Sequence, residues 1–195
     1  IFDLDGTLID SRADIALSVN LTLRDLGQPT MPDETIYGYV GNGVYRLIAD
    51  ATGSDNPQFI THSLEIFDGH YLAHLTEKTR LYPEIEAVLD HYQDKKKVVV
   101  TNKRAKFTRK IMENLGVANR FLSLISGDEA GQLKPHPGMI LQALEQLSIP
   151  PEEAVIIGFL RFCIWAITFA VFYFALQTAK MGRIAGVISV FLSLI

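Results

Sequence analysis

Short apolar runs alternate with longer amphipathic stretches along the chain, and this alternation predicts its elements. The apolar runs stand at residues 1–4, 98–101, 121–127 and 154–158, each bounded by polar residues or glycine. Such runs are typical of buried parallel strands. The stretches between them repeat apolar residues every three or four positions, which predicts helices. The predicted helices cover residues 13–26, 44–51, 59–75, 83–93, 105–115 and 139–147, with a further helix starting at Pro32.

This order of elements predicts an α/β fold with a doubly wound, mostly parallel sheet. Residues 12–80 contain only predicted helices, so they form a helical block inserted after the first strand. One part of the block is ambiguous, because the alternation within residues 17–23 would also suit a strand. The length of that stretch favours a helix.

Two carboxylates, Asp3 and Asp5, end the first apolar run, and Gly6 breaks it. Alternate residues of a strand point to the same side, so both carboxylates are expected at the carboxyl end of the strand. Ligands bind at that end of an open parallel sheet. Two like charges so close need a cation or a proton to offset them. The pair therefore predicts a Mg2+ site with one carboxylate free to attack; the alternative is an Asp-Gly turn with two solvated acids.

Polar residues also follow the second strand and precede the last predicted helix. Thr101 and Asn102 end the run of valines, where a hydroxyl and an amide can donate hydrogen bonds to phosphate oxygens. The alternative is that Thr101 caps the following helix. Lys134 begins the sequence Lys-Pro-His-Pro, whose prolines restrict the backbone, so its charge can be held beside a carboxylate and a phosphate. The alternative is a surface lysine in a rigid turn.

These motifs resemble those of the haloacid dehalogenase-like hydrolases, in particular phosphoglycolate phosphatase-like members. The residues that carry the resemblance are Asp3-x-Asp5-Gly6-Thr7-Leu8, Thr101-Asn102 and Lys134-Pro135-x-Pro137. The resemblance implies Mg2+-dependent hydrolysis of a small phosphomonoester through an aspartyl-phosphate. It implies that Asp3 is nucleophile and metal ligand, and that Asp5 is acid/base and metal ligand. Thr101 and Lys134 would complete the catalytic set.

The resemblance also implies a division into domains and a substrate site. Residues 1–11 and 81–195 would form a Rossmann-like core, and residues 12–80 a helical cap that closes over the site. Thr7 and Asn102 would bind substrate, as would the loop Gly41-Asn42-Gly43, which matches a substrate-facing loop of these caps. A plain helix–helix turn is the alternative for that loop.

Composition narrows the partners of the chain. The net charge of −4 gives no support for nucleic-acid binding. The resemblance implies a small phosphorylated metabolite as the partner. The single cysteine excludes an intrachain disulfide and suits a reducing compartment, and no signal peptide is recognised, which predicts a cytoplasmic protein. The chain opens within a strand and without Met, so we expect residues to be missing before Ile1. The sequence does not predict an oligomeric state.

The acidic residues stop abruptly near the C-terminus. All 22 Asp and Glu lie within residues 1–158, whereas residues 159–195 hold three of the 18 basic residues, a net charge of +3. In the resembled family a Gly-Asp and a later acid follow the last strand and complete the metal site, but here Phe159 follows Gly158. No nearby residue substitutes obviously; Asp128, at the tip of another predicted strand, is the acid to consider. Only residues 176–190 faintly resemble the next helix and strand of the family.

Three interpretations of this atypical apolar tail stay open. It is a frameshifted or decayed gene end, a buried or interface helix, or a membrane anchor. Residues 162–176 are uncharged, and the stretch becomes marginal in length for a bilayer if it extends to residue 179. The function therefore has alternatives. The chain could be an impaired enzyme or pseudoenzyme whose tail contacts a partner or membrane. It could also be a related haloacid dehalogenase, which Asp5 argues against, or a phosphosugar mutase.

Overall fold

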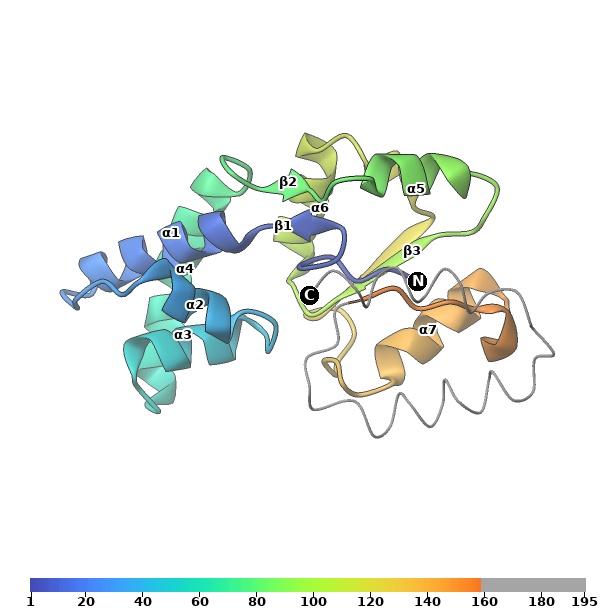
Figure 1. Cartoon of the computed structure of the whole chain (residues 1–195). Coiled ribbons are helices and arrows are strands. Elements are labelled where there is room, and N and C mark those ends of the chain that lie inside the picture. The colour runs from blue at the N-terminus through green and yellow to red at the C-terminus, as the bar shows by residue number, and fades with distance from the viewer. Residues whose placement is uncertain (159–195) are drawn as a thin grey trace. The chain divides into compact units, whose positions relative to one another are not determined.

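The computed structural model describes residues 1–158 (Figure 1). The main compact unit comprises Ile1–Ile149 and Val155–Phe159, and Pro150–Ala154 belongs to a second unit. The helices of the main unit are α1 Arg12–Asp25, α2 Asp33–Tyr39, α3 Val44–Thr52, α4 Pro57–His74, α5 Ile85–His91, α6 Ala105–Asn114 and α7 Gly138–Leu147, with the 3-10 turn η1 Ala118–Arg120. The strands are β1 Ile9–Asp10, β2 Arg80–Leu81, β3 Val98–Thr101 and β4 Ser123–Ser126. In the second unit, Pro151–Glu153 forms the 3-10 turn η2.

The predicted parallel sheet is present. β3 and β4 pair in parallel, with Val98 opposite Ser123 and Thr101 opposite Ser126. Phe2 bridges in parallel to Val99 on one side and to Ile157 on the other. The first residues of the chain therefore lie between β3 and the segment that ends at Gly158. Figure 1 shows α5 and α7 on opposite sides of this sheet, as a doubly wound fold requires.

Apolar residues of the strands and of the covering helices form the core. All four residues of β3 are buried, which explains why this run is apolar without alternation. From α6, Phe107 and Ile111 are buried, and their spacing of four places them on one face of the helix. The sheet prediction from short apolar runs is thus confirmed, although the first and last runs pair only over a few residues.

Helices α1 to α4 form the inserted block, and they pack on one another. From α1, Ala16 and Val19 are fully buried, and α4 contributes Ile60, Phe67 and Tyr71 to the same core. The strand alternative for residues 17–23 is wrong, because α1 runs through them as continuous helix. The fold is therefore α/β with an inserted helical cap.

The two chain segments that join the cap to the sheet run beside each other. β1 and β2 are antiparallel, with Ile9 opposite Leu81 and Asp10 opposite Arg80. The sequence analysis did not predict this pair, since two residues are too few to show a period. Pairing straddles the predicted cap boundary at residue 80, and the division into domains at residues 12 and 80 stays a prediction.

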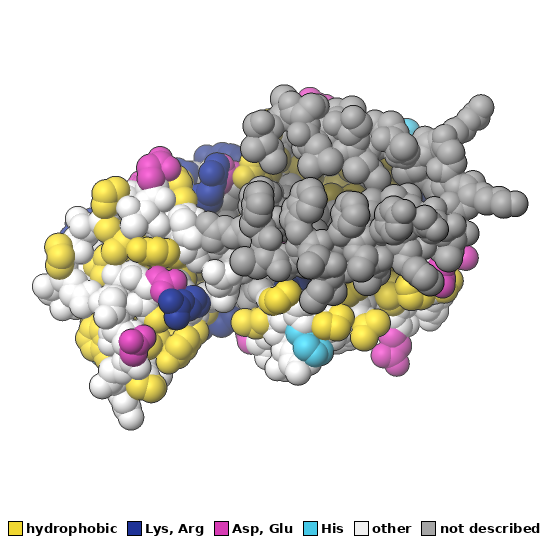
Figure 2. Space-filling model, turned by 60° about the horizontal axis from the view of Figure 1, so that its bottom comes forward, with side chains coloured by type: hydrophobic (Ala, Val, Ile, Leu, Met, Phe, Trp, Pro, Cys, Tyr) yellow, Lys and Arg dark blue, Asp and Glu magenta, His cyan; other side chains and the backbone are white. Residues whose placement is uncertain are grey.

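The surface of the described residues is mixed in character. Figure 2 shows hydrophobic side chains among acidic and basic ones. Leu72, Leu122 and Leu141 are exposed, and single exposed apolar residues of this kind are ordinary. Among residues 1–158, no helix is long and apolar enough to cross a membrane. The interpretations of the apolar tail at residues 159–195 fall outside the described residues.

Candidate active site

A tight turn presents the two predicted carboxylates. The backbone N–H of Asp3 donates to the carbonyl of Ile157 at 2.8 Å, which holds Asp3 in the sheet. After Leu4 the chain turns back, and the N–H of Gly6 donates to the carbonyl of Ile9 at 2.9 Å. Gly6 has φ 78°, a conformation that favours glycine. Asp3 and Asp5 therefore stand at the end of the central strand, where the sequence placed them.

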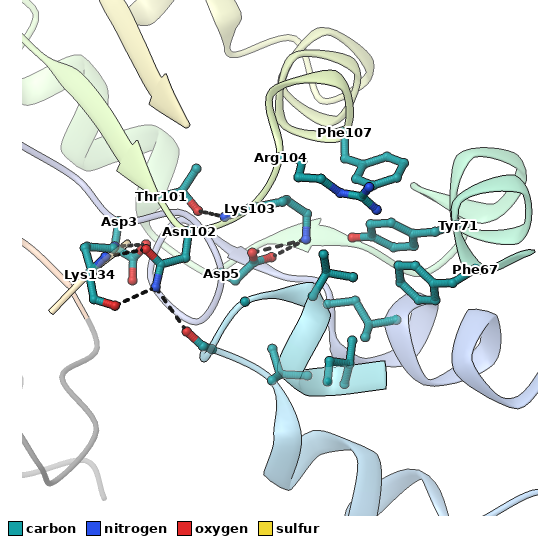
Figure 3. Close-up of a pocket in the computed structure, with 16 residues that line it drawn as sticks. Asp3, Asp5, Phe67, Tyr71, Thr101, Asn102, Lys103, Arg104, Phe107 and Lys134 are labelled. Atoms are coloured by element: carbon teal, nitrogen blue, oxygen red, sulfur yellow. Dashed lines mark hydrogen bonds and ion pairs between the residues drawn. The ribbon is translucent and has the colours of Figure 1, made fainter. Parts of the chain in front are cut away.

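Each carboxylate contacts a different lysine (Figure 3). The ammonium of Lys134 lies 2.7 Å from Oδ1 of Asp3, and that of Lys103 lies 3.0 Å from Oδ1 of Asp5. All four side chains are mostly buried, with exposed fractions between 8% for Lys103 and 24% for Lys134. A partly buried pair is screened less by salt than a surface pair. Two lysines thus offset the two like charges in this structure.

Burial dominates the electrostatics of Asp3. It raises the pKa of the Asp3 carboxyl above its ordinary value, because the charged form loses solvation. Lys134 opposes this shift by its charge and its hydrogen bond, and the backbone N–H of Leu4, 2.8 Å from Oδ1, opposes it as well. The neighbouring charge of Asp5 is the smallest of the causes that raise the pKa.

The polar end of β3 lies beside these carboxylates. The hydroxyl of Thr101 accepts a hydrogen bond from the N–H of Lys103 at 3.1 Å. Thr101 does not cap α6, because the N–H of Ala105 donates instead to the carboxylate of Asp128 at 2.8 Å. The alternative of Thr101 as the helix cap is therefore wrong. Asp128 serves that purpose, and it does not line the pocket described below.

Asn102 ties together three of the predicted site segments. Its side-chain oxygen accepts from the N–H of Lys134 at 2.7 Å, and its amide group donates to the carbonyl of Lys134 at 3.0 Å. The same amide group lies 3.4 Å from the carbonyl of Gly41 in the cap loop. Asn102 thus holds the backbone of the Lys134 loop in place, and its predicted contact with phosphate stays a prediction.

A cavity joins the carboxylates to the cap. It encloses about 100 Å3, less than the roughly 300–1,000 Å3 of a drug-sized ligand site. The core and the cap both contribute to its walls. The lining residues include Asp3, Asp5, Thr101, Asn102, Lys103, Arg104, Phe107 and Lys134 from the core, and Gly41, Gly43, Val44, Leu47, Phe67 and Tyr71 from the cap.

Most of the predicted site residues therefore meet in one place. Thr7 and Asn42 do not line the cavity, although each is next to residues of the turn or loop that borders it. Sequence reasoning missed Lys103, Arg104 and Tyr71. Lys103 and Arg104 directly follow the Thr-Asn motif, which could have drawn attention to them. Tyr71 was read only as part of an apolar helix face.

Few side chains near Asp3 and Asp5 could bind a metal ion. Within residues 1–158, no group of three or more His, Cys, Asp or Glu side chains could hold a metal ion. Gly158 lies against Asp3, since a Cβ at Gly158 would come 3.2 Å from the Cβ of Asp3. The last described residue, Gly158, therefore lies next to Asp3. Asp3 and Asp5 are therefore the acids at this place that could take part in a Mg2+ site, and no third acid among the described residues joins them.

Comparisons with known proteins identify relatives of this chain. The family model of the haloacid dehalogenase-like hydrolases matches residues 1–159. The phosphoglycolate phosphatase of Aquifex aeolicus is 38% identical over 160 residues, covering 81% of this chain and 74% of that protein. That of Colwellia psychrerythraea is 37% identical over 167 residues, with the same coverage.

Solved structures give the same relationship. A predicted phosphoglycolate phosphatase from Haemophilus somnus superposes with a TM-score of 0.76 at 28% identity, covering 80% of this chain and 74% of that one. A predicted phosphatase from Clostridium acetobutylicum superposes with a TM-score of 0.69 at 26% identity, covering 80% and 72%. The chain therefore belongs to the haloacid dehalogenase-like hydrolases.

Proposed function

We propose that this chain is a Mg2+-dependent phosphomonoester hydrolase that works through an aspartyl-phosphate on Asp3. The observation that carries the proposal is the meeting of Asp3, Asp5, Thr101 and Lys134 around one cavity at the ends of the parallel strands. Relatives that are named phosphoglycolate phosphatases at 37–38% identity support the same reaction class.

The contacts of Asp3 suit a nucleophile. Lys134 and the N–H of Leu4 both contact Oδ1. Among the described residues, Oδ2 has no hydrogen-bond partner, so it is the oxygen available for attack. Oδ2 would attack phosphorus as the bond from phosphorus to the ester oxygen breaks. The leaving alcohol takes its proton from Asp5, two residues away on the same turn.

The second half of the reaction reverses these roles. Asp5, now a carboxylate, takes a proton from water as the water oxygen attacks phosphorus, and the bond to Oδ2 of Asp3 breaks. Inorganic phosphate leaves and both carboxylates return to their starting states. Lys134 would offset charge on the phosphoryl oxygens and the hydroxyl of Thr101 would donate a hydrogen bond to them. The Asp3 carboxylate and a backbone carbonyl near Asp5 would hold Mg2+, which would add to this stabilisation of charge.

The cavity favours a small acidic phosphoester, and we propose 2-phosphoglycolate as the substrate to test first. Its volume of about 100 Å3 suits a small molecule. Three cationic side chains, Lys103, Arg104 and Lys134, line it against two carboxylates, Asp3 and Asp5. Because Asp68 pairs with Arg104, each of these cations has an acidic partner, and a bound divalent cation would supply the positive charge that attracts a phosphate carrying a further carboxylate.

Asp3→Asn tests the proposal. The amide is nearly isosteric with the carboxylate and cannot attack phosphorus, so hydrolysis of 2-phosphoglycolate should fall by at least about a thousandfold. Asp10→Asn is the matched control, since Asp10 pairs with Arg12 outside the cavity. Both substitutions are made in the chain itself and in a chimera whose residues after Gly158 come from the Aquifex aeolicus relative. Hydrolysis by Asp3→Asn at the parent rate would show that Asp3 is not the nucleophile.

A second candidate function is a catalytically impaired member of the family. The observation that favours it is the donor set: within residues 1–158 no third acid or His joins Asp3 and Asp5, and no acid follows Gly158 in the sequence. Such a chain would keep the phosphate site and bind the metal weakly. Comparison of the parent with the chimera separates this candidate from a fully active enzyme.

A further inference from the structure

Lys103 is a buried cation that the reaction outlined above does not use. Its side chain is 8% exposed, and burying an ammonium group is costly unless the charge is paired. Its Nζ donates to Oδ1 of Asp5 at 3.0 Å and to Oδ2 at 3.1 Å. The ring of Tyr71 covers the same ammonium, with its centroid 4.9 Å from Nζ.

Asp5 is held in one orientation by these contacts. Lys103 contacts both of its oxygens, and the hydroxyl of Ser11 donates to Oδ1 at 2.5 Å. An acid/base group must be held close to its productive geometry, because small displacements cost large factors in rate. In Figure 3, Lys103 contacts Asp5 on the side that faces away from Asp3 and Lys134.

The covering ring comes from the cap. Tyr71 belongs to α4 and is 2% exposed. It stacks on Phe67 of the same helix and meets Phe107 of α6 edge to face, with ring centroids 4.9 Å apart. Asp68 of α4 also pairs with Arg104 and Lys106 at the start of α6. These contacts fix Tyr71 over Lys103 while the cap lies against α6.

We propose that Lys103 is a positioning residue for Asp5, and that Tyr71 of the cap completes its surroundings. The inference rests on the proposed function, which makes Asp5 the acid/base. Lys103 fixes the orientation of Asp5 and offsets its charge in the second half of the reaction, when Asp5 is a carboxylate. It does so fully only while Tyr71 covers it. Movement of α4 away from α6 would expose Lys103 to water and loosen Asp5, so the cap acts on the chemistry through this lysine.

Substitutions in the full chain, assayed with 2-phosphoglycolate at fixed pH and saturating Mg2+, test the proposal. Lys103→Met keeps the length of the side chain and removes its charge, so kcat should fall about tenfold or more with KM nearly unchanged. Lys103→Arg restores the charge and should recover part of the loss. Lys97→Met is the matched control, because Lys97 is a buried lysine whose ammonium, within residues 1–158, donates to the backbone carbonyls of Tyr92 and Lys95 and to no acid. It should leave kcat unchanged.

The role of the cap residue is tested in the same assay. Tyr71→Leu removes the ring and should lower kcat in the parent chain but not in the Lys103→Met background, because the ring acts through the lysine. A further loss in that background would overturn the part assigned to Tyr71. A rise in KM for Lys103→Met with kcat unchanged would also overturn the proposal, since it would make Lys103 a direct substrate contact.

Thermal unfolding tests the coupling between Lys103 and Asp5 without an activity assay. Lys103→Met leaves the Asp5 carboxylate without its cation and should lower Tm by about 5 °C or more. Adding Asp5→Asn should recover most of that loss, whereas losses that simply add would show that the two side chains are not coupled. If Asp5→Asn keeps the parent kcat, the proposed function is wrong about Asp5. If the Tm losses add, the positioning role of Lys103 is wrong instead.

Discussion

At the scale of single residues, each of the two carboxylates has a lysine partner of its own. For Asp3, the charge of Lys134 has a larger effect on the pKa than the charge of Asp5. Two like charges as close as those of Asp3 and Asp5 are expected to need a cation or a proton to offset them. The cations that contact them among the described residues are lysines. Lys134 pairs with Asp3 and Lys103 pairs with Asp5. Burial, not the charge of Asp5, is the main cause of the raised pKa of Asp3. Each carboxylate therefore has a lysine of its own among the described side chains.

Close backbone packing behind the site gives a prediction at one glycine. A Cβ at Gly127 would stand 2.5 Å from the carbonyl oxygen of Asn102, closer than real contacts allow. Gly127→Ala should push the backbone of Asn102 and disturb the Lys134 loop that Asn102 holds. We expect a loss of about 2 kcal/mol in the free energy of unfolding, measured with urea, and reduced hydrolysis.

The control for Gly127→Ala is the same change in a helix. A Cβ at Gly69, inside α4, would meet no atom within 4 Å. Gly69→Ala should therefore stabilise the protein by up to about 1 kcal/mol, because alanine is the better helix former. If Gly127→Ala has no more effect than Gly69→Ala, the strand ends are looser than their contacts indicate.

At the scale of elements, paired strands and a buried acid fix the exit and return of the cap. β1 and β2 lie antiparallel at the junction. Just inside it, the fully buried carboxylate of Asp14 accepts hydrogen bonds from the N–H of Lys78 at 3.0 Å and of Thr79 at 2.7 Å. Charge-assisted bonds of this kind are stronger than neutral ones. These hydrogen bonds join the start of α1 directly to the end of the cap. They fix the two connections between the cap and the sheet relative to each other.

This junction suggests how to remove the cap. Because Asp10 pairs with Arg80, replacing residues 11–79 with Asn-Gly should close β1 and β2 into a two-residue hairpin. The sheet should fold, and hydrolysis of small phosphoesters should fall by about a hundredfold or more, since the cap excludes water and lines the cavity. The measurements are kcat/KM for 2-phosphoglycolate and circular dichroism.

Loss of the cap also exposes apolar residues of α6, including Phe107. Phe107→Ser in the shortened chain controls for aggregation of this surface. Unchanged kcat/KM in the shortened chain would show that the cap takes no part in turnover. It would also remove the basis for residues 12–80 as a lid.

At the scale of the whole molecule, strong local patterns were predictable and long-range contacts were not. The buried run of β3 and the amphipathic faces of α4 and α6 follow from spacing along the chain. Asp3, Thr101 and Lys134 could be placed at one edge because parallel strands end together. Some contacts depend on the directions of side chains from segments that are distant in the sequence. They are the pairing of Lys103 with Asp5, the hydrogen bond from the N–H of Ala105 in α6 to Asp128, and the contacts of Asn102. No period in the sequence encodes them.

Metal binding by the whole chain depends on how many acids stand near Asp3. Asp3 and Asp5 provide the carboxylates, and within residues 1–158 no third acid or His joins them. Asp128 was the nearest substitute considered from sequence, but its carboxylate caps α6 through the N–H of Ala105. Mg2+ gives up its water reluctantly and is held through few protein ligands, so losing one acid weakens the site substantially.

We therefore expect residues 1–195 to bind Mg2+ weakly and to turn over slowly. The apolar run at residues 169–174 adds a risk of aggregation if it is exposed, so the titration is done with and without detergent. Calorimetric titration with Mg2+ is run beside a steady-state phosphatase assay, and the chimera with the Aquifex aeolicus segment after Gly158 is the positive control. The chimera should bind Mg2+ at least about tenfold more tightly, because in the resembled family a Gly-Asp and a later acid follow the last strand and complete the metal site. Micromolar affinity and ordinary turnover in the parent would show that another residue completes the site, and Asp128→Asn would then be the first substitution to make.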